Sequence, residues 1–552
     1  MKKRRILSAA LAGVLALSLA ACGSNSDETS GTSADTSEAA AEDTEIETGD
    51  DIVNIGFSDA LTSLNPLNMP LSFVDLYANS LQFLPLVAYN SDYGVDGMIA
   101  ESITTDDNLT FHITIREDAV WSDGEPVTSD DVIWTILKMS SPEVANSYFD
   151  FSSFLGFEDG TSPSGATEIE GLVKIDDKNL EMIANTEMSL ESFYNNIATW
   201  ICILPSHALE DIPDDELSST DWFENPTVVS GPYIVQDYDL LHYVSYTANE
   251  NYFLGAPNIE NLNIQIVDGS SLLTKLQSGE LDMVHPSTAI PSTDQEELEE
   301  LDNVTVTYSD NVINEMTFIN TSTVTDSRVR QAIVCAIDRE MLVESILNGH
   351  GEVTDTFICS ASPYYNEEKG TNSYDPDRAE ELLEEAGWDG SQTLEWNVNS
   401  GDESAILAAQ VAQQQLAEVG ITVNINTVDL STLQAEAGSD DVDLTSVQYT
   451  ITPSDYYVDA KWLADDVDGT GSWTGGFYDE DLDAALQATQ TAVTTEELQE
   501  AYDAMEEAML ETVPLFSLYF QSNPGVVNNR IANAEMTFFG AFNNVQEWEI
   551  AE

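Results

Sequence analysis

Basic residues are scarce in this chain of 552 residues. It contains 16 Lys and Arg residues against 100 Asp and Glu residues, which gives a formal net charge of −84 at pH 7. Four of the basic residues stand together at positions 2–5, so the rest of the chain is more acidic still. Such a surface repels the phosphates of nucleic acids and the headgroups of anionic lipids, and it attracts cations. The charge therefore excludes nucleic acid as a partner. The acidity serves either to concentrate cationic ligands or to keep the protein soluble.

Long apolar runs are also absent after residue 22. The one such run, Ile6–Ala20, follows the four basic residues and is too short and too rich in Ala for a transmembrane span. It leads into Leu19-Ala20-Ala21-Cys22, which resembles a bacterial lipobox, the motif in which the Cys sulfur takes a diacylglycerol. The alternative is an ordinary secretory signal in which the Cys stands by chance. Residues 1–22 are therefore predicted to be a lipoprotein signal peptide, with Cys22 as the lipidation site.

Residues 23–50 have few of the side chains that a folded core needs. They are small, polar and acidic, which predicts a disordered tether. A flexible tether of this length reaches on the order of 30 Å. With a lipid on Cys22, it is predicted to hold the folded body at the outer face of the cytoplasmic membrane. In a cell with an outer membrane, this is the periplasmic side.

Cysteine and histidine are too few and too scattered to predict a metal site. Once Cys22 is set aside, three cysteines remain, so at most one disulfide can form among Cys202, Cys335 and Cys359. Cys335 falls on the apolar side of a predicted helix and is expected in the core. Five histidines lie far apart without the spacing of metal ligands. We predict no metal and no cofactor.

Catalytic motifs are absent as well. The chain has no GxSxG, Walker A or HExxH sequence, and its many neighbouring carboxylates, such as Asp440-Asp441, arise by chance in so acidic a chain. No catalytic residue is predicted, and the protein is expected not to be an enzyme. A secreted hydrolase is kept as a distant alternative.

The most distinctive stretch that is present runs from Gly97 to Met139. Alternating apolar and polar residues predict a strand over 109–116, and a turn follows at 122–126. Thr128 and Asp131 have the spacing of a capping box at the start of a helix. The segment AESITTDDNLTFHITIREDAVWSDGEPVTSDDVIWT resembles the signature of the family 5 extracellular solute-binding proteins. These are the oligopeptide, dipeptide and nickel receptors of ABC importers.

Further motifs that resemble this family follow in the family's order through nearly all of residues 51–548. Local signals agree with them: Asp375 is a predicted helix cap, Pro376 the first-turn residue and Gly387 the helix end. Asp326 is another predicted cap. Helices are predicted over 73–86 and 408–419, and strands over 52–57, 421–425 and 513–519, the last returning to the first lobe.

The resemblance implies an α/β fold, a two-lobed periplasmic-binding-protein-like fold of type II. It is the large form, with an extra subdomain in the first lobe and two crossing segments near 309–316 and 518–524. The implied domains are 51–84 with 226–312 and 520–552 for the core of lobe I, 85–225 for the extra subdomain and 313–519 for lobe II.

The resemblance also implies that three segments line a cleft between the lobes. They are Leu71, Ser72 and Phe73; Asn397, Asn399 and Ser400; and the stretch from Gln448 to Tyr457 with Trp473 beyond it. Tyr449, Tyr456, Tyr457 and Trp473 either stack on a ligand or pack in the core.

Peptide-binding members hold the ligand's α-ammonium with an Asp in the third segment. Here Tyr449 or Ile451 stands at that place, and the nearest acid, Asp455, follows Pro453. Two alternatives follow: either the free N-terminus of a peptide matters little for binding, or Asp455 takes the role.

The expected function is that of an extracytoplasmic solute-binding receptor of an ABC importer. It is expected to bind a peptide, to act as a monomer, and to deliver the ligand by hinge closure to a permease and an ATPase that are separate chains. Its contact with the membrane is expected through the lipid anchor only. An oligosaccharide receptor or a nickel-complex receptor of the same fold is the alternative.

Overall fold

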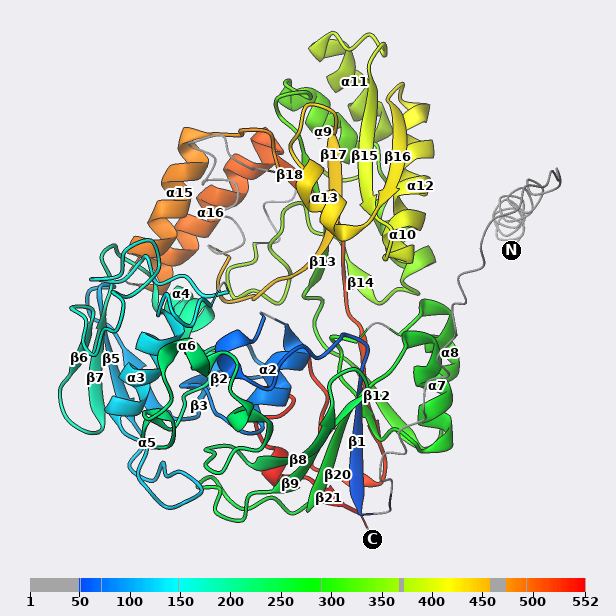
Figure 1. The fold of residues 1–552 in the computed structure, drawn as a ribbon. Coiled ribbons are helices and arrows are strands. Elements are labelled where there is room, and N and C mark those ends of the chain that lie inside the picture. Colours follow the sequence, from blue (N-terminus) through cyan, green and yellow to red (C-terminus); the bar gives the residue numbers. More distant parts are fainter. Residues whose placement is uncertain are drawn as a thin grey trace, which may run out of the picture. The chain divides into compact units, whose positions relative to one another are not determined.

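Two large β-sheets organise the described part of the chain (Figure 1). The computed structural model describes residues 49, 51–70, 72–146, 148–288, 290–366, 372–456, 473–492 and 494–551. Cys22, the predicted tether up to residue 48, Leu71 and Tyr457 lie outside the described residues. All described residues belong to one compact unit, which spans 48–552.

The first sheet has seven strands around the buried strand β1. In spatial order they are β12 (Val304–Tyr308), β19 (Pro524–Asn528), β11 (Met283–Val284), β1 (Ile52–Phe57), β10 (Asn261–Ile266), β9 (Tyr243–Ala248) and β8 (Tyr233–Asp239). β1 is parallel to both of its neighbours, and the remaining pairs are antiparallel.

Helices cover both faces of this first sheet. Successive residues of a strand point to opposite faces, and Val527 packs with helix α2 (Phe73–Ser80) whereas Val526 packs with α7 (Gly269–Ser278) and α8 (Ser292–Glu299). All six residues of β1 are consequently buried. A mostly apolar run such as Ile52–Phe57 suits a strand covered on both faces, and its one polar side chain, Asn54, accepts hydrogen bonds from Asn263 and Gln265.

The second sheet has six strands and is also covered on both faces. In spatial order they are β14 (Gly351–Glu352), β18 (Leu515–Gln521), β13 (Ile313–Ile319), β17 (Leu444–Thr450), β15 (Thr393–Asn399) and β16 (Thr422–Val428). One face packs on α9 (Ser327–Cys335), α10 (Arg339–Ile346), α11 (Pro376–Ala386) and α12 (Glu403–Glu418). The other face packs on α15 (Glu480–Thr491) and α16 (Thr495–Thr512), drawn in orange in Figure 1. A further helix, α13 (Leu430–Glu436), follows β16.

A third, four-stranded antiparallel sheet is inserted into the chain between α2 and β8. Its strands are β4 (Ala100–Thr104), β5 (Thr110–Ile115), β7 (Asn179–Ile183) and β6 (Leu172–Lys174), and its helices are α3 (Ser129–Met139), α4 (Leu190–Phe193), α5 (Ser206–Leu209) and α6 (Asp214–Leu217). β5 and α3 confirm the strand and the helix predicted within Gly97–Met139. Two small strand pairs complete the sheets: β2 (Val87–Tyr89) with β3 (Val95–Gly97), and β20 (Ile531–Ala532) with β21 (Glu549–Ile550).

Two short segments connect the first sheet to the second. Residues 309–312 lead from β12 to β13, and residues 522–523 lead from β18 to β19. The two crossings lie side by side, because the Ser522 hydroxyl donates to the Ser309 carbonyl at 2.6 Å. This confirms the two-lobed arrangement with two crossing segments.

Three predicted elements need correction. The run Val513–Tyr519 was expected as a strand of the first lobe, but β18 pairs with β13 in the second sheet, and only β19 returns to the first. The helix expected at 73–86 ends at Ser80, and the helix expected at 408–419 begins earlier, at Glu403, because the Asp402 side chain caps it.

The three cysteines in the described part of the chain are buried thiols and form no disulfide with one another. Burial raises the pKa of all three, to about 12 for Cys202 and to about 11 for Cys335 and Cys359. Within the described residues, no helix combines the length and the apolar character that crossing a bilayer demands. The described residues also contain no group of three His, Cys, Asp or Glu side chains placed to hold a metal ion.

Candidate functional site

A cavity of about 820 Å³ lies where the inserted region, the first sheet and the second sheet meet. Small-molecule sites usually occupy roughly 300–1,000 Å³. The first-sheet side supplies α2 and residues 539–543, the inserted region supplies residues 148–154 and 188–200, and the second-sheet side supplies Leu430, Gln490 and the end of β17. A ligand in this cavity therefore contacts both halves of the protein.

The start of α2 forms one wall and is held in place by a buried carboxylate. Asp75 accepts hydrogen bonds from the backbone N–H groups of Thr62 and Ser63, each at 3.0 Å, and from the Ser72 hydroxyl at 2.6 Å. These bonds tie the loop after β1 to the first turn of the helix. Ser72 and Phe73, which the family resemblance singled out, both line the cavity.

Aromatic rings from distant parts of the sequence meet at this wall. The Phe73 ring centroid lies 5.7 Å from that of Trp200, 4.9 Å from that of Phe538 and 5.8 Å from that of Phe539. Tyr77 stacks on Phe542 at 4.6 Å. Such rings offer apolar area and electron-rich faces to a ligand, and they lose little conformational entropy when it binds.

A π-helical turn over Tyr194–Ala198 stands two residues before Trp200, a residue of the cavity wall. Asn195, Asn196, Thr199 and Trp200 all line the cavity. Single π-helical turns are rare in proteins, and those that occur often lie at functional sites. Sequence reasoning missed these four residues, since no local pattern distinguishes a π-helical turn from an α-helix.

The second-sheet side contributes the end of β17, as expected. Gln448, Tyr449, Thr450 and Thr452 line the cavity. The Thr452 hydroxyl donates to the Asn195 side chain at 3.4 Å, which joins the two sides of the cavity directly.

Other predicted residues of this segment lie in the core instead. Ile451 and Tyr456 are fully buried on the α15–α16 side of the second sheet, and the Tyr456 hydroxyl lies 3.4 Å from the Cys359 sulfur. Trp473 packs on Phe318, with ring centroids 5.1 Å apart. Of the two roles considered for these aromatics, Tyr456 and Trp473 take the structural one here.

Asp455 lies behind the cavity wall. It is buried, and its carboxylate accepts a hydrogen bond from the Ser192 hydroxyl at 3.0 Å. Ser192 itself lines the cavity. In this conformation Asp455 therefore fixes a wall residue from the second-sheet side instead of presenting its charge to a ligand.

The segment Asn397–Ser400 is not part of the described cavity lining. Asn397 is buried and donates to the Glu436 carboxylate at 3.0 Å, while Asn399 accepts from the Gly401 N–H at 3.0 Å. The Ser400 N–H donates to the Val428 carbonyl at 2.7 Å. The last of these bonds joins the ends of β15 and β16, and the Asn397 bond joins β15 to α13.

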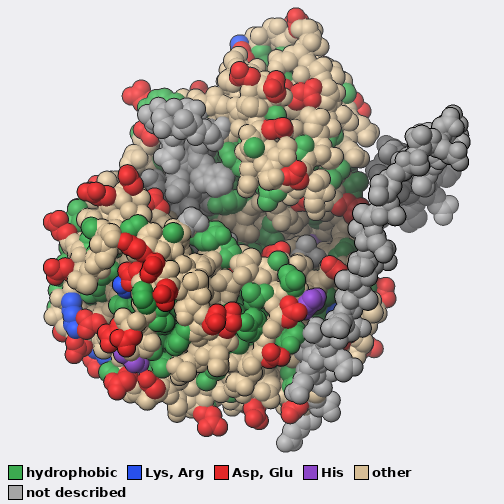
Figure 2. Space-filling view, viewed as in Figure 1, with side chains coloured by type: hydrophobic (Ala, Val, Ile, Leu, Met, Phe, Trp, Pro, Cys, Tyr) green, Lys and Arg blue, Asp and Glu red, His purple; other side chains and the backbone are tan. Residues whose placement is uncertain are grey.

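The charge in the described cavity lining is entirely negative. Asp59 and Asp150 line the cavity, and its described lining contains no Lys, Arg or His. Asp150 accepts hydrogen bonds from the Ser152 N–H and hydroxyl, whereas protein around Asp59 raises the pKa of that carboxyl above its ordinary value. Sequence reasoning missed both residues, because single acids carry no signal in so acidic a chain. The protein surface has the same sign, with Asp and Glu side chains spread over the face in Figure 2.

The fold and the cavity are those of a solute-binding protein, and the sequence comparison agrees. The sequence model of the bacterial extracellular solute-binding proteins, family 5, matches residues 94–471. This is more than half of the chain, and the chain belongs to this family.

Two curated relatives and two solved structures show how far the likeness extends. The oligopeptide-binding protein AppA of Bacillus subtilis is 26% identical over 363 residues, which are 61% of each chain. A putative ABC transporter peptide-binding protein of Brucella ovis is 30% identical over 368 residues, which are 63% of this chain and 64% of that one. The matched part thus spans somewhat over three fifths of the length of these relatives.

The structure of AppA from Bacillus subtilis in complex with a nonapeptide has a TM-score of 0.69 to this chain at 20% identity, over 91% of this chain and 99% of that one. The ABC transporter substrate-binding protein CtaP from Listeria monocytogenes has a TM-score of 0.77 at 21% identity, with the same coverage. The TM-scores establish that this chain shares the fold of these two proteins.

Proposed function

We propose that this protein is the extracytoplasmic receptor of an ABC importer and that it binds peptides. The observation that carries the proposal is the aromatic cavity between the two halves of the protein, beside two short crossing segments. A ligand that contacts both halves stabilises their closed arrangement, and a hinge needs only a few residues to change conformation. The peptide-binding names of the relatives support the choice of ligand.

The receptor performs no chemistry in this proposal. It hands the ligand to a membrane permease, which works with an ATPase, both on separate chains, and it acts as a monomer. An oligosaccharide is the second candidate ligand, because aromatic rings such as Trp200 and Phe73 also stack on sugars.

Native mass spectrometry of protein purified without denaturation identifies the class of any ligand carried along. Calorimetry with a mixture of random pentapeptides then tests binding directly. Peptide masses and saturable heat support the proposal. A bound sugar together with no heat from peptides moves the function to the second candidate.

Replacing Trp200 by Ala is expected to weaken peptide binding by about thirtyfold, which corresponds to roughly 2 kcal/mol. Trp200 is partly exposed and its ring contacts Phe73 within the cavity, so truncation removes ligand contact area more than core packing. Tyr478→Ala is the matched control, since Tyr478 is 62% exposed and lies away from the cavity. Equal affinities of the two variants, measured by calorimetry, would place the ligand elsewhere.

We also propose that Cys22 anchors the protein to the membrane through a lipid. The support is the sequence Leu19-Ala20-Ala21-Cys22 after a short apolar run. Replacing Cys22 by Ser is expected to abolish metabolic labelling with a fatty acid and to shift the protein from the membrane fraction to the medium. Retention of Cys22→Ser in the membrane fraction would show that the anchor is not this lipid.

A further inference from the structure

Asp59 is a cavity residue whose charge is left without a partner in the described part of the chain. It lies two residues after the end of β1, is exposed, and lines the cavity. No hydrogen bond or ion pair from another described residue reaches its carboxylate. The residue is exposed at the cavity, and partial desolvation by the surrounding protein raises the pKa of its carboxyl above the ordinary value. A carboxylate in such a place is stabilised by any cation that enters the cavity.

A second carboxylate adds to the negative potential at Asp59. Asp75 is fully buried, and its oxygens accept four hydrogen bonds from Thr62, Ser63 and Ser72. Its position is therefore fixed, and after burial it is the next cause that raises the pKa of Asp59. The loop after β1 thus holds two acids close together, of which only Asp59 faces the ligand.

The basic side chains in the described part of the chain are engaged elsewhere. Each described Lys or Arg has an acidic or a backbone-carbonyl partner outside the cavity. Arg530, for example, makes a two-pronged ion pair with the buried Asp282. The described cavity lining therefore offers two carboxylates and several aromatic rings, but no cation for a ligand's carboxylate.

We propose that Asp59 binds a positively charged amine or guanidinium group of the ligand, and that this contact makes the receptor selective for cationic ligands. The inference rests on the proposed function and names the chemistry of the ligand. The aromatic wall supports the same group, because a cation over the face of a Trp, Tyr or Phe ring is attracted by its electrons. The acidic surface concentrates cationic ligands near the cavity. If the bound cation is the α-ammonium, this selectivity is an alternative to the expectation that the free N-terminus of a peptide matters little.

The test uses one pentapeptide without acidic side chains, chosen from those that bind, in four forms. These are the free peptide, the N-acetylated form, the C-amidated form and a form in which every Lys or Arg is replaced by norleucine. Either the N-acetylated form or the norleucine form lacks the cation that Asp59 binds. With the unmodified receptor, that form is expected to bind about thirtyfold or more weakly than the free peptide, as for a charge-assisted contact that loses one partner. C-amidation is expected to change affinity by less than about threefold, because the described cavity lining offers no cation to the carboxylate.

The receptor variant Asp59→Asn is expected to lose the same factor for the free peptide and to stop distinguishing it from the uncharged form. Asp59→Glu keeps the charge and is expected to retain most of the discrimination. Asp92→Asn, an exposed residue away from the cavity, is the control for net charge. Unchanged thermal unfolding of each variant confirms that it folds.

Three outcomes would overturn the inference while the proposed function stands. In the first, all four peptide forms bind equally. In the second, the Asp59→Asn receptor still distinguishes the free peptide from its uncharged form. In the third, this distinction is lost in the Asp150→Asn receptor and not in the Asp59→Asn receptor. If no form of any peptide binds to the unmodified receptor, the proposed function itself fails.

Discussion

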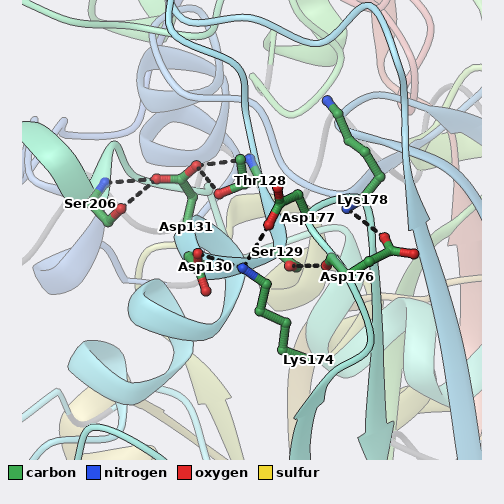
Figure 3. Close-up of polar contacts among 9 residues, drawn as sticks. All are labelled: Thr128, Ser129, Asp130, Asp131, Lys174, Asp176, Asp177, Lys178 and Ser206. Atoms are coloured by element: carbon green, nitrogen blue, oxygen red, sulfur yellow. Dashed lines mark hydrogen bonds and ion pairs between the residues drawn. The ribbon is translucent and has the colours of Figure 1, made fainter.

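Replacing Asp131 by Asn is expected to destabilise helix α3 and its surroundings by about 3 kcal/mol or more. Asp131 is buried, and its two oxygens accept hydrogen bonds from two segments far apart in the sequence. One oxygen accepts from the Ser206 N–H at 3.0 Å and hydroxyl at 2.6 Å, and the other accepts from the Thr128 N–H at 2.9 Å (Figure 3). An Asn side chain replaces one of these oxygens with an NH₂ group, so donors at Thr128 or Ser206 face another donor.

The measurement is native-state hydrogen exchange of the α3 amides, which reports the free energy of local opening. Asp130→Asn is the matched control, one residue away. Asp130 is 63% exposed and its ion pair with Lys174 at 2.7 Å lies at the surface, so its loss is expected to cost less than about 1 kcal/mol. Similar losses in the two variants would mean that the buried bonds of Asp131 contribute no more than a surface pair.

Replacing Glu315 by Gln is expected to stabilise the protein at pH 8 and to have little effect at pH 4. Glu315 lies on β13, fully buried, and neither of its oxygens has a described hydrogen-bond partner. The hydroxyl of Tyr519, its cross-strand neighbour, also has no described partner. Burial first, and then the charge of Asp402, raise the pKa of Glu315 well above its ordinary value.

The sign of the pH dependence follows from this raised pKa. The unfolded chain releases the Glu315 proton near pH 4.3, about the value for a free Glu, whereas the folded protein holds it to a higher pH. Between these two pH values the folded state binds more protons, so stability falls as the pH rises, by at most about 1.4 kcal/mol per pH unit. Gln carries no titrating proton, so this loss is expected to vanish in Glu315→Gln.

Calorimetric unfolding of both proteins between pH 4 and pH 8 checks this expectation. Glu384→Gln, at an exposed position of α11, makes the same substitution outside the core and is expected to follow the unmodified protein at every pH. Parallel curves for Glu315→Gln and the unmodified protein would contradict a protonated, buried Glu315.

The sequence by itself determined the elements whose signals are local. Asp375 caps α11, Pro376 stands in its first turn, and Gly387 ends it with a φ of 72°, as predicted. Asp326 caps α9 through the Arg328 N–H. These predictions hold because a cap, a Pro ring or a left-handed Gly acts within about four residues.

The family resemblance also placed part of the cavity. Ser72, Phe73 and Tyr449 line it, as expected from motifs that cover most of the chain. Leu71 and Tyr457 lie outside the described residues, and Asn397, Asn399 and Ser400 lie outside the described cavity lining.

Only the tertiary structure decided the rest. β18 is an apolar run that suits either sheet, and its pairing with β13 depends on residues about 200 positions away in the sequence. Trp200 and Asp59 are 141 positions apart, and the fold brings both to the cavity, one just after a π-helical turn and the other in the loop after β1. Asp455 is the nearest acid in its segment, yet its hydrogen bond to Ser192 holds it behind the wall. Composition and periodicity describe one segment at a time, whereas a binding site consists of side chains that the fold brings together from several segments.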